Sequence, residues 1–104
     1  MKRVKRRYLA LKVECEALPN EREFTDAVWA AVTRLYGEVG ASQAALSLID
    51  FDVEHKTAVI RVSLATLDMV KASLATIISI AGKEASVRVS SISGTIRALH
   101  SNRG

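Results

Sequence analysis

The sequence predicts an α+β domain in which two helices cover one face of a four-stranded antiparallel sheet. Four segments alternate apolar and polar residues, as half-buried strands do. Two further segments carry apolar residues at helical spacing, and each stands between two of the alternating segments. The chain has 104 residues, of which 49% are apolar, and this suits a single hydrophobic core.

The first strand and the first helix are expected within residues 8–37. In the strand, the core side would hold Leu9, Leu11, Val13 and Cys15, and the outer side Tyr8, Ala10, Lys12 and Glu14. Asn20 followed by Glu23 is typical of a capping box and predicts the start of the helix. Gly37 is expected to end the helix in a left-handed conformation. The apolar stripe of this helix would be Phe24, Val28, Ala31, Val32 and Leu35.

A hairpin, a second helix and a last strand are expected to follow. Residues 41–52 and 55–63 predict two strands joined by a polar turn. The strongest helical periodicity lies between an expected N-cap at Thr66 and Gly82, with an apolar stripe of Leu67, Val70, Leu74, Ile77, Ile78 and Ala81. Residues 84–93 alternate again, with Val87 and Val89 toward the core. The chain is expected to close with a short turn of helix and a frayed end.

The order strand, helix, strand, strand, helix, strand is that of the ferredoxin-like α/β sandwich, and the RNA-recognition motif (RRM) has a similar four-stranded sheet. Right-handed crossovers would place the first and third strands at the centre. Tyr8, Lys12 and Arg61 would then lie near one another on the face without helices, with Arg88 one strand away. The expected organisation is a basic N-terminal arm (residues 1–7), a single ferredoxin-like domain (8–100) and a C-terminal tail (101–104).

Positive charge is concentrated at the start of the chain. The net charge is +4, yet residues 1–12 hold six basic side chains and no acid, which leaves 9 basic against 11 acidic residues elsewhere. After Glu84 only basic charges follow, namely Arg88, Arg97 and Arg103. Basic clusters at both ends predict contact with a polyanion, with RNA phosphate preferred over an anionic membrane surface. A solvated tail that only aids solubility is the alternative for the arm.

The sequence predicts a protein without a membrane span that is cytoplasmic, with the nucleus as the alternative in a nucleated cell. A single cysteine, Cys15, excludes an intramolecular disulfide and suits a reducing compartment. The basic start runs into an alternating segment rather than into the apolar core of a signal peptide. No apolar run reaches the roughly 18 residues that a membrane-spanning helix needs.

The residues that usually carry catalysis or bind metals are scattered. His55 is expected in a turn and His100 in the tail, with no spacing typical of metal ligands, and Cys15 is expected to be buried. Three acids near the same turn are expected to be solvated, with weak cation binding as the alternative: Asp50, Asp52 and Glu54. No catalytic residue, metal site or bound cofactor is therefore expected in this chain.

Protein contacts are expected on the helices. The non-core side of the second helix carries few charges, and weakly polar helix faces often pack in interfaces. A poorly charged side that only faces solvent is the alternative. Trp29 lies off the main stripe of the first helix, where it would either anchor an interface or edge the core. The expected interface residues are Trp29, Met69, Ser73, Thr76 and Ile80.

Four segments taken together resemble a known family. They are RRYLALKV (residues 6–13), LYGEVGAS (35–42), AVIRVS (58–63) with a following helix that ends IISIAG, and SSISGTIRAL (90–99). In this order and spacing they resemble the small Pop/Rpp-type protein subunit of archaeal and eukaryotic ribonuclease P, its protein component two. The resemblance covers residues 6–100, and the short length without a long acidic tail is more similar to the archaeal members.

The resemblance implies a subunit of an enzyme whose catalyst is RNA. Such ribonucleoproteins remove 5′ leaders from precursor tRNA with Mg²⁺ held largely by the RNA. The implied partners are the catalytic domain of that RNA, a TIM-barrel-like protein subunit and a second copy of this subunit within a heterotetramer, with precursor tRNA contacted only indirectly. The third strand lacks the aromatic rings on which RRMs stack bases, so contact with a structured RNA backbone is expected instead. The expected RNA-binding residues are Lys2, Arg3, Lys5, Arg6, Arg7, Lys12, Arg61, Arg88 and Arg97.

Two other functions stay open on the residues alone. A ferredoxin-like regulatory or ligand-binding domain that dimerises through its sheet would need no RNA. A stand-alone enzyme on this fold would be active without RNA. The basic outer face argues against the first alternative, and the lack of a convergent catalytic set argues against the second.

Overall fold

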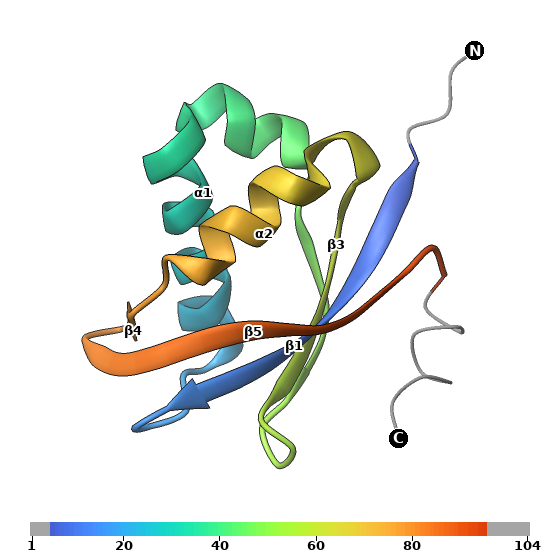
Figure 1. The fold of residues 1–104 in the computed structure, drawn as a ribbon. Coiled ribbons are helices and arrows are strands. Elements are labelled where there is room, and N and C mark those ends of the chain that lie inside the picture. Colours follow the sequence, from blue (N-terminus) through green and yellow to red (C-terminus); the bar gives the residue numbers. More distant parts are fainter. Residues whose placement is uncertain (1–4, 96–104) are drawn as a thin grey trace.

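Two helices pack against one face of a curved antiparallel sheet in the computed structural model, which describes residues 5–95 (Figure 1). The sheet has five strands in the order β2-β3-β1-β5-β4. The elements along the chain are β1 (Arg6–Cys15), α1 (Glu21–Ala44), β2 (Ser47–Asp52), β3 (Thr57–Ser63), a 3₁₀ turn (Leu64–Thr66), α2 (Leu67–Ala75), β4 (Ser79–Ile80) and β5 (Lys83–Ser93).

The predicted arrangement of the long strands is confirmed, but the predicted number of strands is wrong. β1 pairs antiparallel with both β3 and β5, so the first and third strands are central as expected. The additional strand is β4, which pairs through Ser79 and Ile80 with the start of β5. It occupies residues that the helical periodicity had assigned to the second helix.

The second helix ends at Ala75, six residues before the end that its periodicity predicts. Ala81 and Gly82 both have positive φ (52° and 80°), which suits the tight turn that joins two twisted antiparallel strands. β-branched isoleucines before this turn favour a strand as readily as a helix. Thr66 stands at the N-cap without a side-chain hydrogen bond to the helix, and its hydroxyl instead donates to the Ser63 carbonyl at 3.1 Å.

The first helix begins as predicted and ends later than predicted. The Glu23 amide donates to Asn20 Oδ1 at 2.8 Å, and the Asn20 amide donates to Glu23 Oε1 at 3.0 Å, which completes the capping box. Gly37 does interrupt the helix with a positive φ (φ 74°, ψ 178°), but helical structure resumes after it and continues to Ala44. Residues 41–44 are therefore helical and do not belong to the second strand.

We expect Gly37→Ala to destabilise the fold. The φ and ψ of Gly37 fall in a region that is essentially reserved for glycine, so an alanine there would cost about 1–3 kcal/mol of unfolding free energy. Urea denaturation followed by circular dichroism measures this loss. Glu38→Ala, at the exposed helical residue that follows, is the control and should change the unfolding free energy by less than about 0.5 kcal/mol. Equal stability of the two variants would show that the break in α1 is not held in this conformation.

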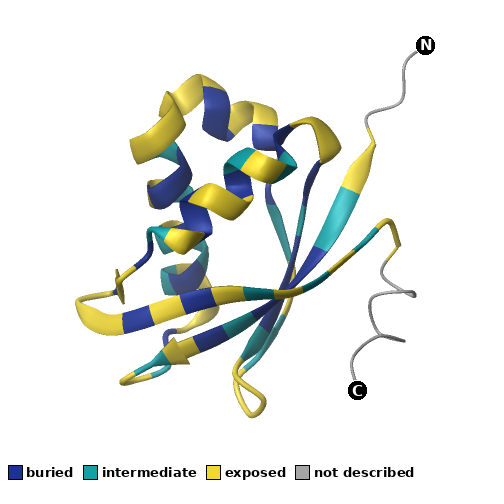
Figure 2. Ribbon diagram, in the orientation of Figure 1, coloured by how far each residue is buried: buried dark blue, intermediate teal, exposed yellow. Residues whose placement is uncertain are grey.

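The core lies between the helices and the inner face of the sheet (Figure 2). Leu9, Leu11 and Val13 of β1 are fully buried, as their alternation predicts. Phe24 of α1 is also fully buried, and its ring lies 5.4 Å from that of Phe51 in β2. Leu35, which was expected in the core, is 45% exposed, because the break at Gly37 follows directly and turns the chain.

Candidate nucleic-acid interface

The start of β1 and the ends of β3 and β5 meet at one end of the sheet. Tyr8 of β1 pairs with Arg61 of β3 on one side and with Ser93 of β5 on the other. The strands are antiparallel, so the chain enters the described structure and leaves it at this same end (Figure 1). Three of the predicted RNA-binding residues, Lys2, Arg3 and Arg97, lie outside the described residues.

The backbone of the basic residues at the start of β1 is hydrogen-bonded to β3 and to the residue that follows it. β1 begins at Arg6, two residues before the expected start, and Arg6 and Arg7 pair with Ser63 and Val62 of β3. The Lys5 carbonyl accepts a hydrogen bond from the Leu64 amide at 2.8 Å. The side chains of Lys5 and Arg6 are nevertheless exposed. Their charges are therefore displayed from a backbone that the sheet holds in place.

The outer face of the sheet carries the other predicted basic residues. Tyr8 lies beside Arg61, and Lys12 lies beside Arg88, since these residues form direct cross-strand pairs. The expected proximity is therefore confirmed for Tyr8 and Arg61, whereas Lys12 lies four residues further along β1, beside Arg88. Arg88 Nη2 is 3.8 Å from Glu14 Oε1 in an exposed ion pair, which holds the guanidinium only weakly.

The outer face is not uniformly basic. Strand alternation and the register with β3 place Asp50 and Asp52 of β2 on this face, opposite Val59 and Thr57. The register shifts between Leu48 and Asp50, so the two acids lie on the outer face although Leu48, two residues before Asp50, faces the core. Positive charge is thus densest at the start of β1 and decreases toward the β2 edge. The sequence analysis did not predict this decrease in positive charge, because the bulge in β2 that puts the two acids on the outer face is not visible in the alternation of residues.

Small apolar residues fill the middle of the outer face. Ala10, which was expected to point away from the core, is only 3% exposed, and Val59 beside it is 1% exposed. Tyr8 packs against both. Among the described residues, two buried polar side-chain atoms have no hydrogen-bond partner, and both are in this region: Arg61 Nε and Ser91 Oγ. A buried polar group without a partner costs free energy, and a polar ligand is one way to supply the partner.

The described histidine lies in the β2–β3 turn. His55 Nδ1 is 2.6 Å from Asp52 Oδ2 in the β2–β3 turn, and both groups are accessible to solvent. The hydrogen bond from the His55 side chain lowers the pKa of Asp52. Within residues 5–95, no group of three His, Cys, Asp or Glu side chains is placed to hold a metal ion. His100 lies outside the described residues.

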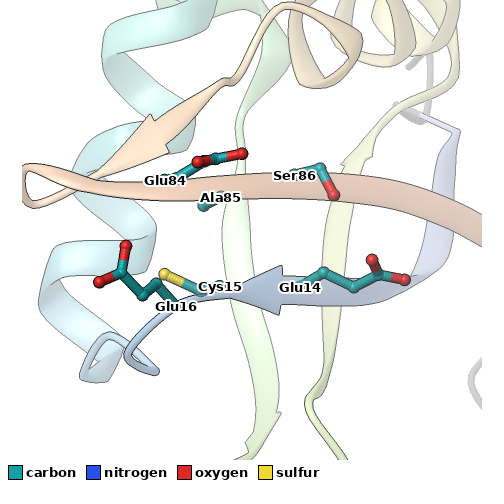
Figure 3. A pocket seen from close by; sticks show the side chains of 6 residues that line it. All are labelled: Glu14, Cys15, Glu16, Glu84, Ala85 and Ser86. Atoms are coloured by element: carbon teal, nitrogen blue, oxygen red, sulfur yellow. The ribbon is translucent and has the colours of Figure 1, made fainter.

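A shallow hollow lies at the opposite end of the sheet, where the end of β1 runs beside the start of β5 (Figure 3). Cys15 is half-buried there rather than fully buried, and its thiol donates to the Ala17 carbonyl at 2.9 Å. The hollow is lined by Glu14, Cys15, Glu16, Glu84, Ala85 and Ser86. Three carboxylates make this end of the sheet acidic, which disfavours the binding of a phosphate here.

Comparison with known proteins decides the family. The sequence profile of the Rpp14/Pop5 family matches residues 7–102, which is nearly the whole chain. The chain belongs to this family. Ribonuclease P protein component 2 of Pyrococcus furiosus is 38% identical over 97 residues, which cover 93% of this chain and 81% of the relative. The protein of the same name from Methanobrevibacter smithii is 31% identical, over 88% of this chain and 82% of the relative.

A solved structure confirms the fold of this Rpp14/Pop5 member. A chain in the cryo-EM structure of yeast ribonuclease MRP superposes with a TM-score of 0.67 at 21% identity. The match covers 93% of this chain and 79% of the yeast chain. No helix within residues 5–95 is long and apolar enough to cross a membrane.

The early end of α2 changes the surface that was predicted to contact proteins. Ser73 and Ile80 are 0% and 1% exposed, so neither presents a side chain at the surface of this Rpp14/Pop5 member. Ser73 donates to the Met69 carbonyl within the helix, and Ile80 packs into the core from β4. The other three residues stay partly exposed: Trp29, Met69 and Thr76.

Large apolar side chains are exposed at places that the sequence analysis did not assign to protein contact. Leu35, Tyr36 and Val39 flank the break in α1, and Ile78, between α2 and β4, is 77% exposed. Ile78 was assigned to the core because it continues the stripe of α2 by four residues from Leu74. The short GEVG segment was the only signal for the break. These residues are the main apolar candidates for protein contact in the described part of the chain.

Proposed function

We propose that this chain is protein component 2 of a ribonuclease P, the ribonucleoprotein that removes 5′ leaders from precursor tRNA. The observation that carries the proposal is the identity with named ribonuclease P components along nearly the full chain, together with the exposed basic residues at one end of the sheet. In this role the RNA performs the chemistry with its Mg²⁺ ions. The protein contributes surface and charge, and itself holds no cofactor.

The basic end of the sheet is proposed to bind RNA phosphates. Lys5 and Arg6 have exposed side chains at the start of β1. Arg61 of β3 pairs with Tyr8, two residues after Arg6 in β1. Neutralising closely spaced phosphates releases condensed counterions and lowers the repulsion that opposes RNA folding. We assign three further residues to the same surface because they are close to it in sequence: Lys2, Arg3 and Arg97. Lys12 and Arg88 are assigned to the margin of this surface.

The remaining assignments follow from the same role. The chain is proposed to bind the catalytic domain of the RNA, to pair with a TIM-barrel-like protein subunit and to self-associate within a heterotetramer, with precursor tRNA contacted only indirectly. The scaffold is assigned to the ferredoxin-like folds on the strand order β2-β3-β1-β5. We place the protein in the cytoplasm, as expected for tRNA processing in an archaeal-type cell.

Reconstituted cleavage tests this function. A cognate ribonuclease P RNA and the TIM-barrel-like subunit are assayed on precursor tRNA at modest Mg²⁺, with and without this chain. We expect cleavage to depend on the chain and to fall when four basic residues are replaced by alanine: Lys2, Arg3, Lys5 and Arg6. Substitution is preferable to removing residues 1–7, because that would delete two paired residues of β1.

The assay also separates the alternatives. Cleavage that is unchanged by adding the chain would contradict the ribonuclease P role and favour a dimeric ligand-binding domain. Cleavage by the purified chain without RNA would instead indicate a stand-alone enzyme. Mg²⁺ titration adds a further check, since a protein that screens phosphate repulsion should lower the Mg²⁺ concentration that the RNA needs.

A further inference from the structure

The middle of the outer sheet face brings one aromatic ring together with two polar side chains. Tyr8 of β1 pairs with Arg61 of β3, and Ala10, two residues further along β1, pairs with Ser91 of β5. Residues that stand directly opposite each other in antiparallel strands share a face, so these four residues lie together on the side of the sheet without helices. We call this group of four residues the central site.

Two polar groups of the central site lack partners. Arg61 Nε and Ser91 Oγ are buried, and neither has a hydrogen-bond partner among the described residues. Within residues 5–95, no ion pair engages the Arg61 guanidinium. Leaving both groups unpaired costs free energy in the free protein, and a ligand that hydrogen-bonds to both of them recovers this cost.

The central site can admit a planar ligand. Tyr8, Arg61 and Ser91 are each half-buried, and a change of rotamer can bring the unpaired Arg61 Nε to the surface. The Tyr8 ring packs against Ala10 and Val59 and contacts no other aromatic ring among the residues that the structure describes. A ring that rests on an apolar floor with one face can stack on a planar ligand with the other.

A nucleobase fits these groups better than a phosphate does. Arg61 Nε only donates a hydrogen bond, whereas the Ser91 hydroxyl donates or accepts, and the edge of a base presents both kinds of group. A phosphate ester offers acceptors only. The exposed carboxylate of Asp50 stands opposite Val59 on the same face and disfavours a second negative charge beside it.

We infer that the central site binds one unpaired nucleobase of the RNA, with Tyr8 stacked on the base and with Arg61 and Ser91 hydrogen-bonded to its edge. The inference rests on the RNA-binding role in the proposed function and adds a contact to a base beyond the contacts to phosphates. The base must be unpaired, because a base inside a duplex is stacked between its neighbours and presents neither face.

The basic end of the sheet can hold the phosphate of the same nucleotide. Arg6 precedes Tyr8 by two residues and lies on the same face, about 7 Å away along β1. This separation is within the span of one nucleotide. Arg6 would therefore position the strand through its backbone, and the central site would contact the base.

Chemical probing of the cognate ribonuclease P RNA, in complex with this chain and the TIM-barrel-like subunit, tests the base contact. Dimethyl sulfate and a carbodiimide modify unpaired bases, whereas hydroxyl radicals report on the backbone. We expect the chain to protect at least one unpaired base. This protection should be lost in Tyr8→Leu and in Arg61→Lys, while protection of the backbone stays. The double alanine variant of Lys5 and Arg6 should instead lose protection of the backbone.

Binding affinities separate stacking and hydrogen bonding from charge. Tyr8→Leu should weaken RNA binding roughly tenfold, whereas Tyr8→Phe, which keeps the ring, should change it by less than about twofold. Arg61→Lys keeps the positive charge but loses the Nε–H donor. It should therefore bind more weakly while the slope of log affinity against log salt stays the same.

Ser91→Ala distinguishes a binding role from a structural one. Removing a buried hydroxyl that has no partner should not lower the stability of the free chain, yet it should weaken RNA binding by about fivefold. Ser86→Ala is the matched control, because it removes an exposed hydroxyl from the same face of β5, opposite Glu14, and should change neither quantity. Urea denaturation measures the stability, and equilibrium binding measures the affinity.

Three results would overturn the inference: no unpaired base protected by the chain, base protection that survives Tyr8→Leu, or equal affinities of Arg61→Lys and the unchanged chain. Protection of the backbone without protection of any base would overturn this inference alone. Protection of neither would contradict the proposed RNA-binding role as well.

Discussion

Replacing Lys5 and Arg6 by alanine is expected to weaken binding to ribonuclease P RNA and to reduce its dependence on salt. If the basic end of the sheet and the arm neutralise five to seven phosphates, the plot of log affinity against log salt should have a slope of about −4 to −6. Each lost phosphate contact removes about one unit, so the double variant should be shallower by about two. Equilibrium binding over a series of salt concentrations measures both slopes.

The structure provides a control with the same change in charge. Lys71 and Lys83 are exposed on α2 and at the start of β5, away from the start of β1, and their double alanine variant should keep the original slope. The backbone bond from Leu64 to Lys5 does not involve the lysine side chain, so the sheet should stay intact in the test variant. A flat salt response of the unchanged chain, or equal losses in both double variants, would rule out a phosphate-binding role for this end of the sheet.

Phe24→Ala is expected to remove a large part of the stability of the domain. Phe24 is fully buried between α1 and the sheet and packs on Phe51, and truncating such a ring costs about 3–5 kcal/mol. The total stability of a small domain is only about 5–15 kcal/mol. Urea denaturation at equilibrium should therefore show a much lower midpoint, or an unfolded protein at 37 °C.

Ile78→Ala is the informative comparison. The helical stripe of the sequence places Ile78 in the core, where its truncation would cost about 2–5 kcal/mol. The structure leaves this side chain 77% exposed, so we expect a change of less than about 0.5 kcal/mol in the monomer. A large loss at Ile78 would contradict the early end of α2 and the position of β4. The measurement should be made at low protein concentration, where self-association does not contribute.

Several features of this protein were determined by local sequence. Alternation identified β1 and its buried residues, because a strand places successive side chains on opposite faces whatever it pairs with. Asn20 and Glu23 specified the start of α1 through hydrogen bonds that involve only four consecutive residues. Chain order and crossover handedness predicted the central position of β1 and β3. The concentration of positive charge in the first residues could be counted directly.

Other features were decided only by tertiary contacts. A run such as Ile77–Ile80 fits a helical stripe and a strand equally well, and pairing with Lys83 and Glu84 selected the strand. A bulge between Leu48 and Asp50 determined which acids share the outer face with the arginines. The hollow that Arg34, Thr76 and Ile78 line beside α1 exists because α2 stops early. Local sequence therefore determined the elements and their order, whereas the ends of elements and the residues that share a surface depended on pairing partners distant in the chain.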